Sequence, residues 1–228
     1  MTNDTRSIPV LYGLPALILV DQQMGGGNPP AINCPGCDQA MDNTVPLLTS
    51  ARKAGLPIVH LQEFHRKELV DYGHELDGDE GVHCLEATPA VELYPPLAPV
   101  DGEWLLQKRR YSGFFATDLD LLLRGLGVQT VILTGQLTNV CVHYTAIDAH
   151  QYNYVVRVAR DCVAGSSERA HQASLEAMEY HQHGAICSSQ EIIEALSGKN
   201  YAPTWRIASS EDLLRRRWYA PWDLTRTT

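Results

Sequence analysis

The sequence predicts a three-layer α/β/α fold built on a central, mainly parallel six-stranded sheet. Six short apolar runs alternate with segments that carry the apolar period of a helix. Residues 16–20 are continuously apolar, as is typical of a strand buried on both faces. Strands and helices in alternation favour parallel strands with helices on both faces of the sheet. The chain has 228 residues, of which 44% are hydrophobic, and this is enough for one large domain.

The first part of the chain contains two predicted strands and one helix. The strands are the apolar runs 16–20, which ends directly at Asp21, and 57–61. A helix is predicted over 43–54, with Pro46 in its first turn, where a missing backbone N–H costs no hydrogen bond.

Two long loops are predicted, one between the first strand and this helix and one after the second strand. Residues 25–37 are rich in glycine and proline, and residues 63–103 combine charge, glycine and proline without a period. Loops as long as the second one are commonly lids or binding loops. We therefore expect 63–103 to run over the sheet and both loops to set substrate specificity.

The rest of the chain repeats the alternation of strand and helix. From residue 119, leucines recur at i, i+3, i+4 and i+7, which is the apolar stripe of a helix. Ser188 and Glu191 have the spacing of a capping box. The predicted strands are 104–108, 128–134, 154–158 and 185–187. The first two predicted helices cover 119–126 and 136–150. A third begins after Ser166 or Ser167 and passes Met178, and a fourth runs from Ser188 to Gly198.

Composition narrows the classes of partner. The net charge of −9 disfavours nucleic acid and anionic membranes, both of which select positive surfaces. No apolar run approaches the roughly 18–20 residues of a membrane span, and the N-terminal residues lack a signal-peptide pattern. We expect a cytoplasmic protein with a small-molecule substrate, and its six cysteines are expected to be thiols.

Three chemically versatile side chains follow or end predicted strands. Asp21 follows the first strand, Lys108 ends the third, and Gly135 after the fourth leads into Cys141 near a helix start. Ligands of such sheets bind at the carboxyl ends of the strands. A helix N-terminus, a carboxylate and a lysine would together favour a thiolate nucleophile. Each residue also has a structural interpretation: Asp21 as a turn residue, Lys108 as a solvated cation and Cys141 as a small core side chain.

Three segments resemble the isochorismatase-like cysteine hydrolase superfamily, which has a Rossmann-like sheet. They are Leu17-Ile-Leu-Val-Asp21-Gln-Gln23, Lys108-Arg-Arg-Tyr-Ser-Gly113-Phe-Phe-Ala-Thr-Asp-Leu119 and Thr134-Gly-Gln-Leu-Thr138-Asn-Val-Cys141-Val. Their order and spacing also match, and the resemblance covers about residues 14–198. It implies one hydrolase domain over 1–198, followed by a C-terminal extension, 199–228, that packs on the body or on a neighbouring subunit. It also implies a homo-oligomer, a dimer or tetramer.

The resemblance implies a catalytic role for each residue of this cluster. Cys141 is the nucleophile, Asp21 the base and Lys108 the supporting cation of a reaction that passes through a thioester. The backbone N–H groups of Leu137 and Cys141 form the oxyanion hole, and the Gln136–Leu137 peptide is cis. True isochorismatases carry glycine where this chain has Cys141, so the cysteine favours hydrolysis of a C–N bond.

The segment after the second strand bears on metal use. Nicotinamidases in this superfamily bind zinc through Asp-x-His and a further histidine. This chain has Glu63-Phe-His65 there, with His74 and His83 downstream. The glutamate resembles the ureidoacrylate, biuret and N-carbamoylsarcosine hydrolases, which work without metal, so no metal and no cofactor are expected. A zinc-dependent nicotinamidase-like amidase and a non-catalytic member of the fold remain alternatives.

Six residues are candidates for the substrate pocket, although each could instead serve packing. They are Gln23, Asn28, His65, Tyr111, Phe115 and Gln136. Cys34-Pro-Gly-Cys37 is a single CxxC within a Pro/Gly loop. A structural zinc site needs four ligands and a redox pair needs an adjacent helix N-terminus, so we expect neither use here.

Overall fold

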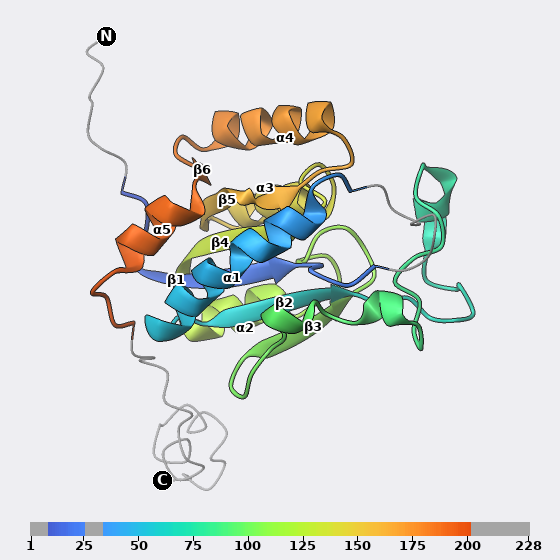
Figure 1. The fold of residues 1–228 in the computed structure, drawn as a ribbon, viewed down its shortest axis with the longest axis horizontal. Coiled ribbons are helices and arrows are strands. Elements are labelled where there is room, and N and C mark those ends of the chain that lie inside the picture. The colour runs from blue at the N-terminus through green and yellow to red at the C-terminus, as the bar shows by residue number, and fades with distance from the viewer. Residues whose placement is uncertain (1–8, 26–33, 202–228) are drawn as a thin grey trace, which may run out of the picture.

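A computed structural model describes residues 9–25 and 34–201 and has the predicted α/β/α architecture (Figure 1). One six-stranded sheet has the order β3-β2-β1-β4-β5-β6, and all five strand pairs are parallel. The strands are β1 Leu14–Val20, β2 Ile58–Glu63, β3 Trp104–Lys108, β4 Val128–Gln136, β5 Val155–Ala164 and β6 Ile186–Cys187. The α-helices are α1 Cys37–Lys53, α2 Leu119–Leu126, α3 Cys141–Gln151, α4 Glu168–His181 and α5 Ser189–Leu196.

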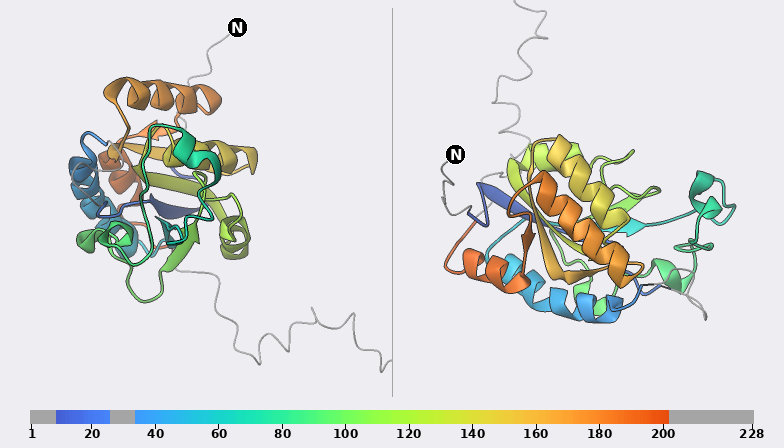
Figure 2. Two further views of the ribbon diagram at one scale, coloured as in Figure 1. Left: turned by 90° about the vertical axis from the view of Figure 1, so that its right-hand side faces the viewer. Right: turned by 90° about the horizontal axis from the view of Figure 1, so that it is seen from above.

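Helices cover both faces of the sheet and create two apolar cores (Figure 2). Helices α1 and α5 pack on one face, and α2, α3 and α4 pack on the other. Strand β1 feeds both cores, because Leu17 and Leu19 point to the first face while Ile18 and Val20 point to the second. Burial on both faces explains why this strand is continuously apolar in the sequence.

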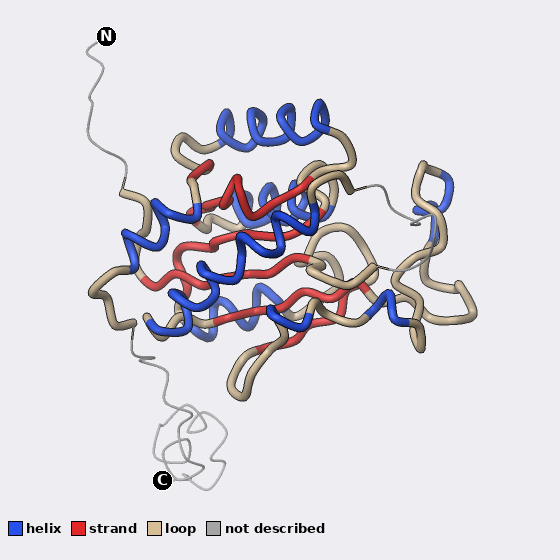
Figure 3. Tube along the Cα trace, viewed as in Figure 1, coloured by secondary structure: helices blue, strands red, loops and turns tan. Residues whose placement is uncertain are grey.

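The direction of strand addition reverses between β1 and β4. From β1 the chain adds β2 and β3 on one side, and it then returns to add β4, β5 and β6 on the other. Such a reversal opens a crevice at the carboxyl ends of the two central strands. After Glu63, the last residue of β2, the chain extends beyond this end of the sheet and then returns past the end of α1 to the opposite end, where β3 begins. Residues 64–103 are mainly loop, with the 3₁₀ helices Gly73–Asp77, Pro89–Val91 and Pro95–Leu97 (Figure 3).

The boundaries of α1 differ from the prediction. The helix begins at Cys37, six residues before the predicted start, directly after Gly36 in the left-handed region with φ 81°. Pro46 therefore lies inside the helix rather than in its first turn. Buried side chains in the early part of the helix, such as Met41, hold it against the sheet and offset the lost hydrogen bond of the proline.

The predicted C-terminal extension is described only at its beginning. The N–H of Tyr201 donates to the carbonyl oxygen of Ala54 at 2.8 Å, so this first stretch packs on the body beside the end of α1. The remainder of the extension, residues 202–228, lies outside the described residues. Among the helices that the structure describes, none combines the length and the apolar character of a membrane span.

Gly135 in β4 has a backbone that other residues cannot adopt easily. Its φ is 114°, and an added Cβ would overlap the carbonyl oxygen of Val20 in β1. We expect Gly135→Ala to lower the free energy of unfolding by about 3 kcal/mol or more, from backbone strain and overlap together. Urea denaturation followed by circular dichroism measures the change.

Gly125→Ala is the matched control for this substitution. Gly125 lies in α2, and an added Cβ would meet no atom within 4 Å. Alanine there should raise stability by up to about 1 kcal/mol, because glycine is a poor helix former. Equal stability of the two variants would contradict the close approach of β4 to β1.

Candidate active site

The three side chains predicted at the strand ends lie together at the crevice. Asp21 follows β1, Lys108 is the last residue of β3, and Cys141 is the first residue of α3. The Lys108 Nζ atom lies 2.8 Å from Asp21 Oδ2 and donates a hydrogen bond to Cys141 Sγ at 3.3 Å. All three residues are at least 94% buried. The structural alternatives of a solvated lysine and a simple turn aspartate therefore do not describe this cluster.

The backbone of Asp21 is held in an unusual conformation. Its φ is 49°, in the left-handed region that non-glycine residues avoid. Its N–H donates to the carbonyl oxygen of Leu61 in β2, and its own carbonyl oxygen accepts from the N–H of Gln23 and from Nε2 of Gln136. Neighbouring strands thus fix the turn from both sides and aim the carboxylate at Lys108.

Burial and charge set the protonation states of the cluster. Burial raises the pKa of Asp21 to about 6 against the opposing pull of Lys108. Burial also raises the pKa of the Cys141 thiol well above its usual range, and the Lys108 cation does not outweigh it. Although burial opposes it, the charges of Asp21 and Glu63 hold the pKa of Lys108 well above its usual range.

The resting site at neutral pH therefore holds a thiol, a carboxylate and an ammonium group. The helix start at Cys141 does not by itself produce a thiolate, in contrast to what the sequence pattern favours. A base must remove the thiol proton during attack. Ligand atoms of Asp21, Glu63 and Cys141 all lie within 4.8 Å of one another, which places carboxylates near that proton.

The loop between β4 and α3 presents backbone N–H groups beside the thiol. The peptide bond between Gln136 and Leu137 is cis. The carbonyl oxygen of Leu137 accepts from the N–H groups of Val140 at 3.0 Å and Val142 at 3.1 Å, which closes a compact turn before α3. Cys141 is in the first helical turn, where backbone N–H groups have no partner within the helix.

A cavity of about 260 Å³ opens onto this cluster. Asp21, Leu137 and Cys141 line it, so the thiol, the carboxylate and the predicted oxyanion residues face one space. This volume suits a small organic molecule rather than a polymer. The predicted pocket residues Gln23 and Gln136 also line it.

Gln23 has a structural task as well. Its side-chain amide donates to the carbonyl oxygens of Glu63 and Ala90, and its Oε1 atom accepts from the N–H of Glu63. These bonds tie the end of β2 to the long loop. The amide of Gln136 is similarly occupied, because its Nε2 atom donates to the Asp21 carbonyl oxygen at 2.9 Å.

The other predicted pocket residues lie elsewhere. Tyr111 stacks on Tyr144 and lines a second, adjoining pocket. Phe115 is 59% exposed, whereas its neighbour Phe114 is buried and packs in the core. Asn28 lies outside the described residues.

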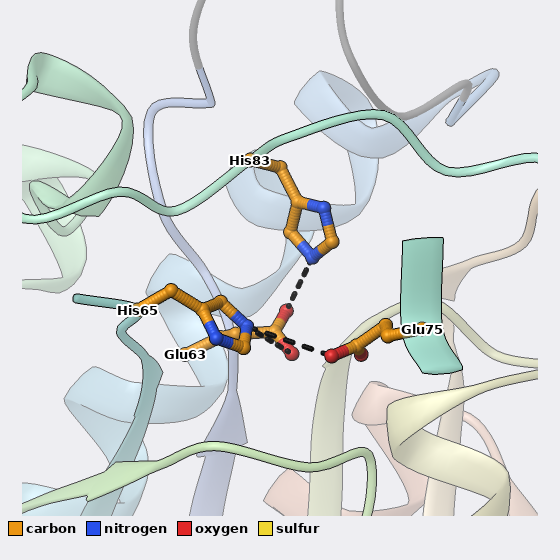
Figure 4. A group of neighbouring side chains, drawn as sticks. All are labelled: Glu63, His65, Glu75 and His83. Carbon is orange, nitrogen blue, oxygen red and sulfur yellow. Dashed lines mark ion pairs between the residues drawn. The ribbon is translucent and has the colours of Figure 1, made fainter. Parts of the chain in front are cut away.

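His65 lies behind the cavity wall, in a buried cluster with Glu63, Glu75 and His83 (Figure 4). Its Nε2 atom is 3.8 Å from Glu63 Oε1 and 3.6 Å from Glu75 Oε2, and its ring stacks on Tyr72. The other oxygen of the Glu63 carboxyl group, Oε2, lies 3.5 Å from Nε2 of His83. This carboxyl group therefore faces both imidazoles.

Glu63 joins this cluster to the catalytic one. Its Oε1 atom is 3.4 Å from Lys108 Nζ, and it also lines the cavity. In the sequence, Glu63 stands out only as part of the Glu63-Phe-His65 motif. It is nevertheless the last residue of β2, and ligands of such sheets bind at the carboxyl ends of the strands. Glu75 gave no such signal, because it lies in the long loop without a period.

The buried cluster has the chemistry of a divalent-metal site. Four ligand atoms, one from each residue, lie within 4.8 Å of one another. Both ring nitrogens of His65, Nε2 of His83 and both carboxylate oxygens of Glu75 lack hydrogen-bond partners among the described residues. Two imidazole nitrogens and two carboxylates are a ligand set that zinc accepts, so these residues fit such an ion.

Known proteins share this fold and sequence pattern. The chain is 31% identical over 190 residues to maleamate amidohydrolase of Pseudomonas putida, across 80% of this chain and 86% of that protein. The N-carbamoylsarcosine amidase structure from Thermoplasma acidophilum matches with a TM-score of 0.65 and 26% identity, over 78% of this chain and 97% of that one. The pyrazinamidase of Pyrococcus horikoshii in complex with zinc matches with a TM-score of 0.69 and 28% identity, over 77% and 99%.

The family model named Isochorismatase domain matches residues 15–192, which include β2 to β6 and all of β1 except Leu14. Because this match spans most of the chain and includes Asp21, Lys108 and Cys141, the protein belongs to the isochorismatase family.

Proposed function

We propose that this chain is a cysteine amidohydrolase that cleaves a C–N bond of a small amide, ureido or carbamoyl compound. The observation that carries the proposal is the buried contact of Lys108 Nζ with both Asp21 Oδ2 at 2.8 Å and Cys141 Sγ at 3.3 Å. The names of the similar proteins, maleamate amidohydrolase and N-carbamoylsarcosine amidase, support the reaction class.

The first half of the proposed reaction forms a thioester. Asp21 takes the thiol proton as Cys141 Sγ attacks the carbonyl carbon, and the C=O bond opens to an oxyanion. The N–H groups of Leu137 and Cys141 donate to that oxyanion. Asp21 then returns the proton to the nitrogen, the C–N bond breaks, and ammonia or an amine leaves.

The second half restores the thiol. Asp21 takes a proton from water, the hydroxide oxygen attacks the thioester carbon, and the C–S bond breaks. The thiolate sulfur of Cys141 recovers the proton from Asp21. Throughout both halves, Lys108 stays charged and stabilises whichever of its two neighbours is negative.

The charges of the cavity favour neutral or cationic substrates. Four carboxyl groups line it, from Asp21, Asp38, Glu63 and Glu80, and its described lining residues include no lysine or arginine. Residues 26–33, which the structure does not describe, include no charged residue. A substrate carboxylate would meet like charges here, which is unfavourable in a buried site.

The experiment that tests the proposal is ammonia release from a panel of small amides. Two neutral compounds, nicotinamide and biuret, are compared with maleamate and N-carbamoyl amino acids, which carry a carboxylate. We expect turnover of at least one member, with neutral members preferred. The proposal would be refuted if the wild-type protein released no ammonia from any member of the panel and Cys141 were alkylated no faster than Cys84.

The rate should depend on pH through Asp21. Its pKa is raised to about 6, and only the ionised carboxylate can accept the thiol proton, so kcat/KM should fall as the pH drops through about 6. The charge of Glu63 contributes to this raised pKa. Glu63→Gln should therefore move the acidic limb to lower pH, and an unmoved limb would contradict the assignment of Asp21 as the base.

A second candidate function, a zinc-dependent amidase, is favoured by the buried cluster of Glu63, His65, Glu75 and His83. A structure with zinc exists for the similar pyrazinamidase. Held by these residues, a divalent ion would supply Lewis-acid chemistry at the wall of the cavity. This candidate is the zinc-dependent alternative that the sequence left open beside the metal-free expectation drawn from Glu63.

Metal analysis of the purified chain after zinc addition and desalting distinguishes the two candidates. If the cluster binds zinc, the wild type should retain about one ion per chain, and His65→Ala should lose it because the set falls to three ligands. The exposed His74 in the same loop provides the control, and His74→Ala should keep the ion. Full activity after chelation, with no retained metal, would favour the metal-free candidate.

A further inference from the structure

The Cys34-Pro-Gly-Cys37 motif forms a tight turn that brings its two cysteines together. The N–H of Cys37 donates to the carbonyl oxygen of Cys34 at 3.2 Å, and Gly36 between them has φ 81° and ψ 7°. Proline at the second position and glycine with positive φ at the third are the signature of a type II turn. The end residues of such a turn have Cα atoms within about 7 Å, a range that overlaps the span of a disulfide.

Cys37 also opens a long helix. It is the first residue of the 17-residue α1, where free N–H groups and the helix dipole favour a thiolate. The sequence had suggested a Pro/Gly loop without an adjacent helix, and the early start of α1 corrects this. The neighbouring Cys34 side chain, the largest cause, lowers the pKa of Cys37 to about 7 despite partial burial.

The two thiols lie in the wall of the cavity that contains Cys141. Cys34 Sγ donates to Oε1 of Gln136 at 3.5 Å, and Nε2 of Gln136 donates to the carbonyl oxygen of Asp21 at 2.9 Å. A short chain of contacts thus connects the motif to the residue before Leu137 and to the backbone of the base.

The other thiols are less suited to exchange. These four, Cys84, Cys141, Cys162 and Cys187, are buried, and burial raises the pKa of each above its usual range. Cys34 and Cys37 are both free and both only partly buried. An oxidising disulfide should therefore react first at Cys37.

We propose that Cys34 and Cys37 form a reversible dithiol–disulfide couple in the wall of the substrate cavity, oxidised by exchange with a low-molecular-weight disulfide such as oxidised glutathione. The Cys37 thiolate attacks one sulfur of the oxidant, its S–S bond breaks, and one glutathione thiolate leaves. Cys34 then loses its proton and attacks the Cys37 sulfur, which displaces the second glutathione. Two cysteines are oxidised and one glutathione disulfide is reduced to two thiols.

Closure of the disulfide alters the cavity. An oxidised Cys34 has no S–H to donate to Gln136, and both sulfurs move to bonding distance of each other. The wall of the cavity shared with Cys141 therefore changes shape between the two states. We expect the rate at which iodoacetamide alkylates Cys141 to change severalfold on oxidation.

The couple can be tested by redox titration of the full chain in glutathione buffers. After rapid alkylation, mass spectrometry of peptides shows which thiols are protected. We expect loss of two hydrogens, located to the peptide with Cys34 and Cys37, reversed by reduced glutathione. Alkylation of both thiols at every buffer ratio, or a disulfide that involves Cys141, would overturn the proposal.

Single variants separate the steps. Cys34→Ser should trap a glutathione adduct on Cys37, because the resolving thiol is missing, whereas Cys37→Ser should show no fast adduct. Cys162→Ser, at a buried thiol in the core beneath α1 and α5, should titrate like the wild type. A lasting glutathione adduct on Cys37 in the wild type would exclude the internal disulfide. Equal rates of Cys141 alkylation in the reduced and oxidised protein would exclude an effect of the disulfide on the cavity. Neither readout depends on the proposed amidase activity.

Discussion

Cys141→Ala is expected to lower kcat by about 10⁴-fold or more, because the reaction then lacks its covalent nucleophile. The remaining residues cannot form a thioester, and the adjacent Asp21 and Lys108 are left with only binding and electrostatic roles. The side chain is buried and small, so its removal should leave the fold intact. Ammonia release from the best substrate of the panel measures the loss.

The control for this variant is Cys162→Ala. Cys162 is also fully buried, but it lies in the core beneath α1 and α5 and not beside Lys108. It should retain activity near that of the wild type, which separates loss of the nucleophile from loss of a buried thiol. Activity of the Cys141→Ala variant on any substrate would contradict the covalent mechanism.

Lys108→Met is expected to damage both activity and stability. Lys108 is 1% exposed and faces Asp21, Glu63 and Cys141, so its removal leaves two carboxyl groups without their shared cation. Breaking a buried pair in this way costs about 3–5 kcal/mol of folding free energy. We also expect kcat/KM to fall at least about 100-fold, since a buried charge at the reacting centre is lost.

The pH dependence of this variant gives a further check. Lys108 lowers the pKa of Asp21, so without it the acidic limb of any residual activity should move to higher pH. Lys53→Met, an exposed lysine in the last turn of α1, should change stability by less than about 0.5 kcal/mol and leave activity unaltered. Wild-type stability of Lys108→Met in urea denaturation would contradict the buried contacts.

The order of strands and helices was accessible from the sequence because buried parallel strands leave a continuous apolar signal. The same signal placed Asp21, Lys108 and Cys141 at strand or helix ends, and a parallel sheet gathers its carboxyl ends at one edge. The sequence places Gly135 at a strand end, but it does not show that this glycine lies against the backbone of Val20. That close approach depends on how β4 and β1 pair in the sheet.

The sequence by itself therefore determined the layered fold and the edge of the sheet at which the chemistry lies. Only the tertiary structure decided what surrounds that edge. His65 proved to lie behind the cavity wall with Glu75 and His83, and Cys37 proved to open α1. The physical reason is that residues in loops without a period are positioned by side-chain packing and charge contacts across long sequence separations, and local patterns carry no record of those contacts.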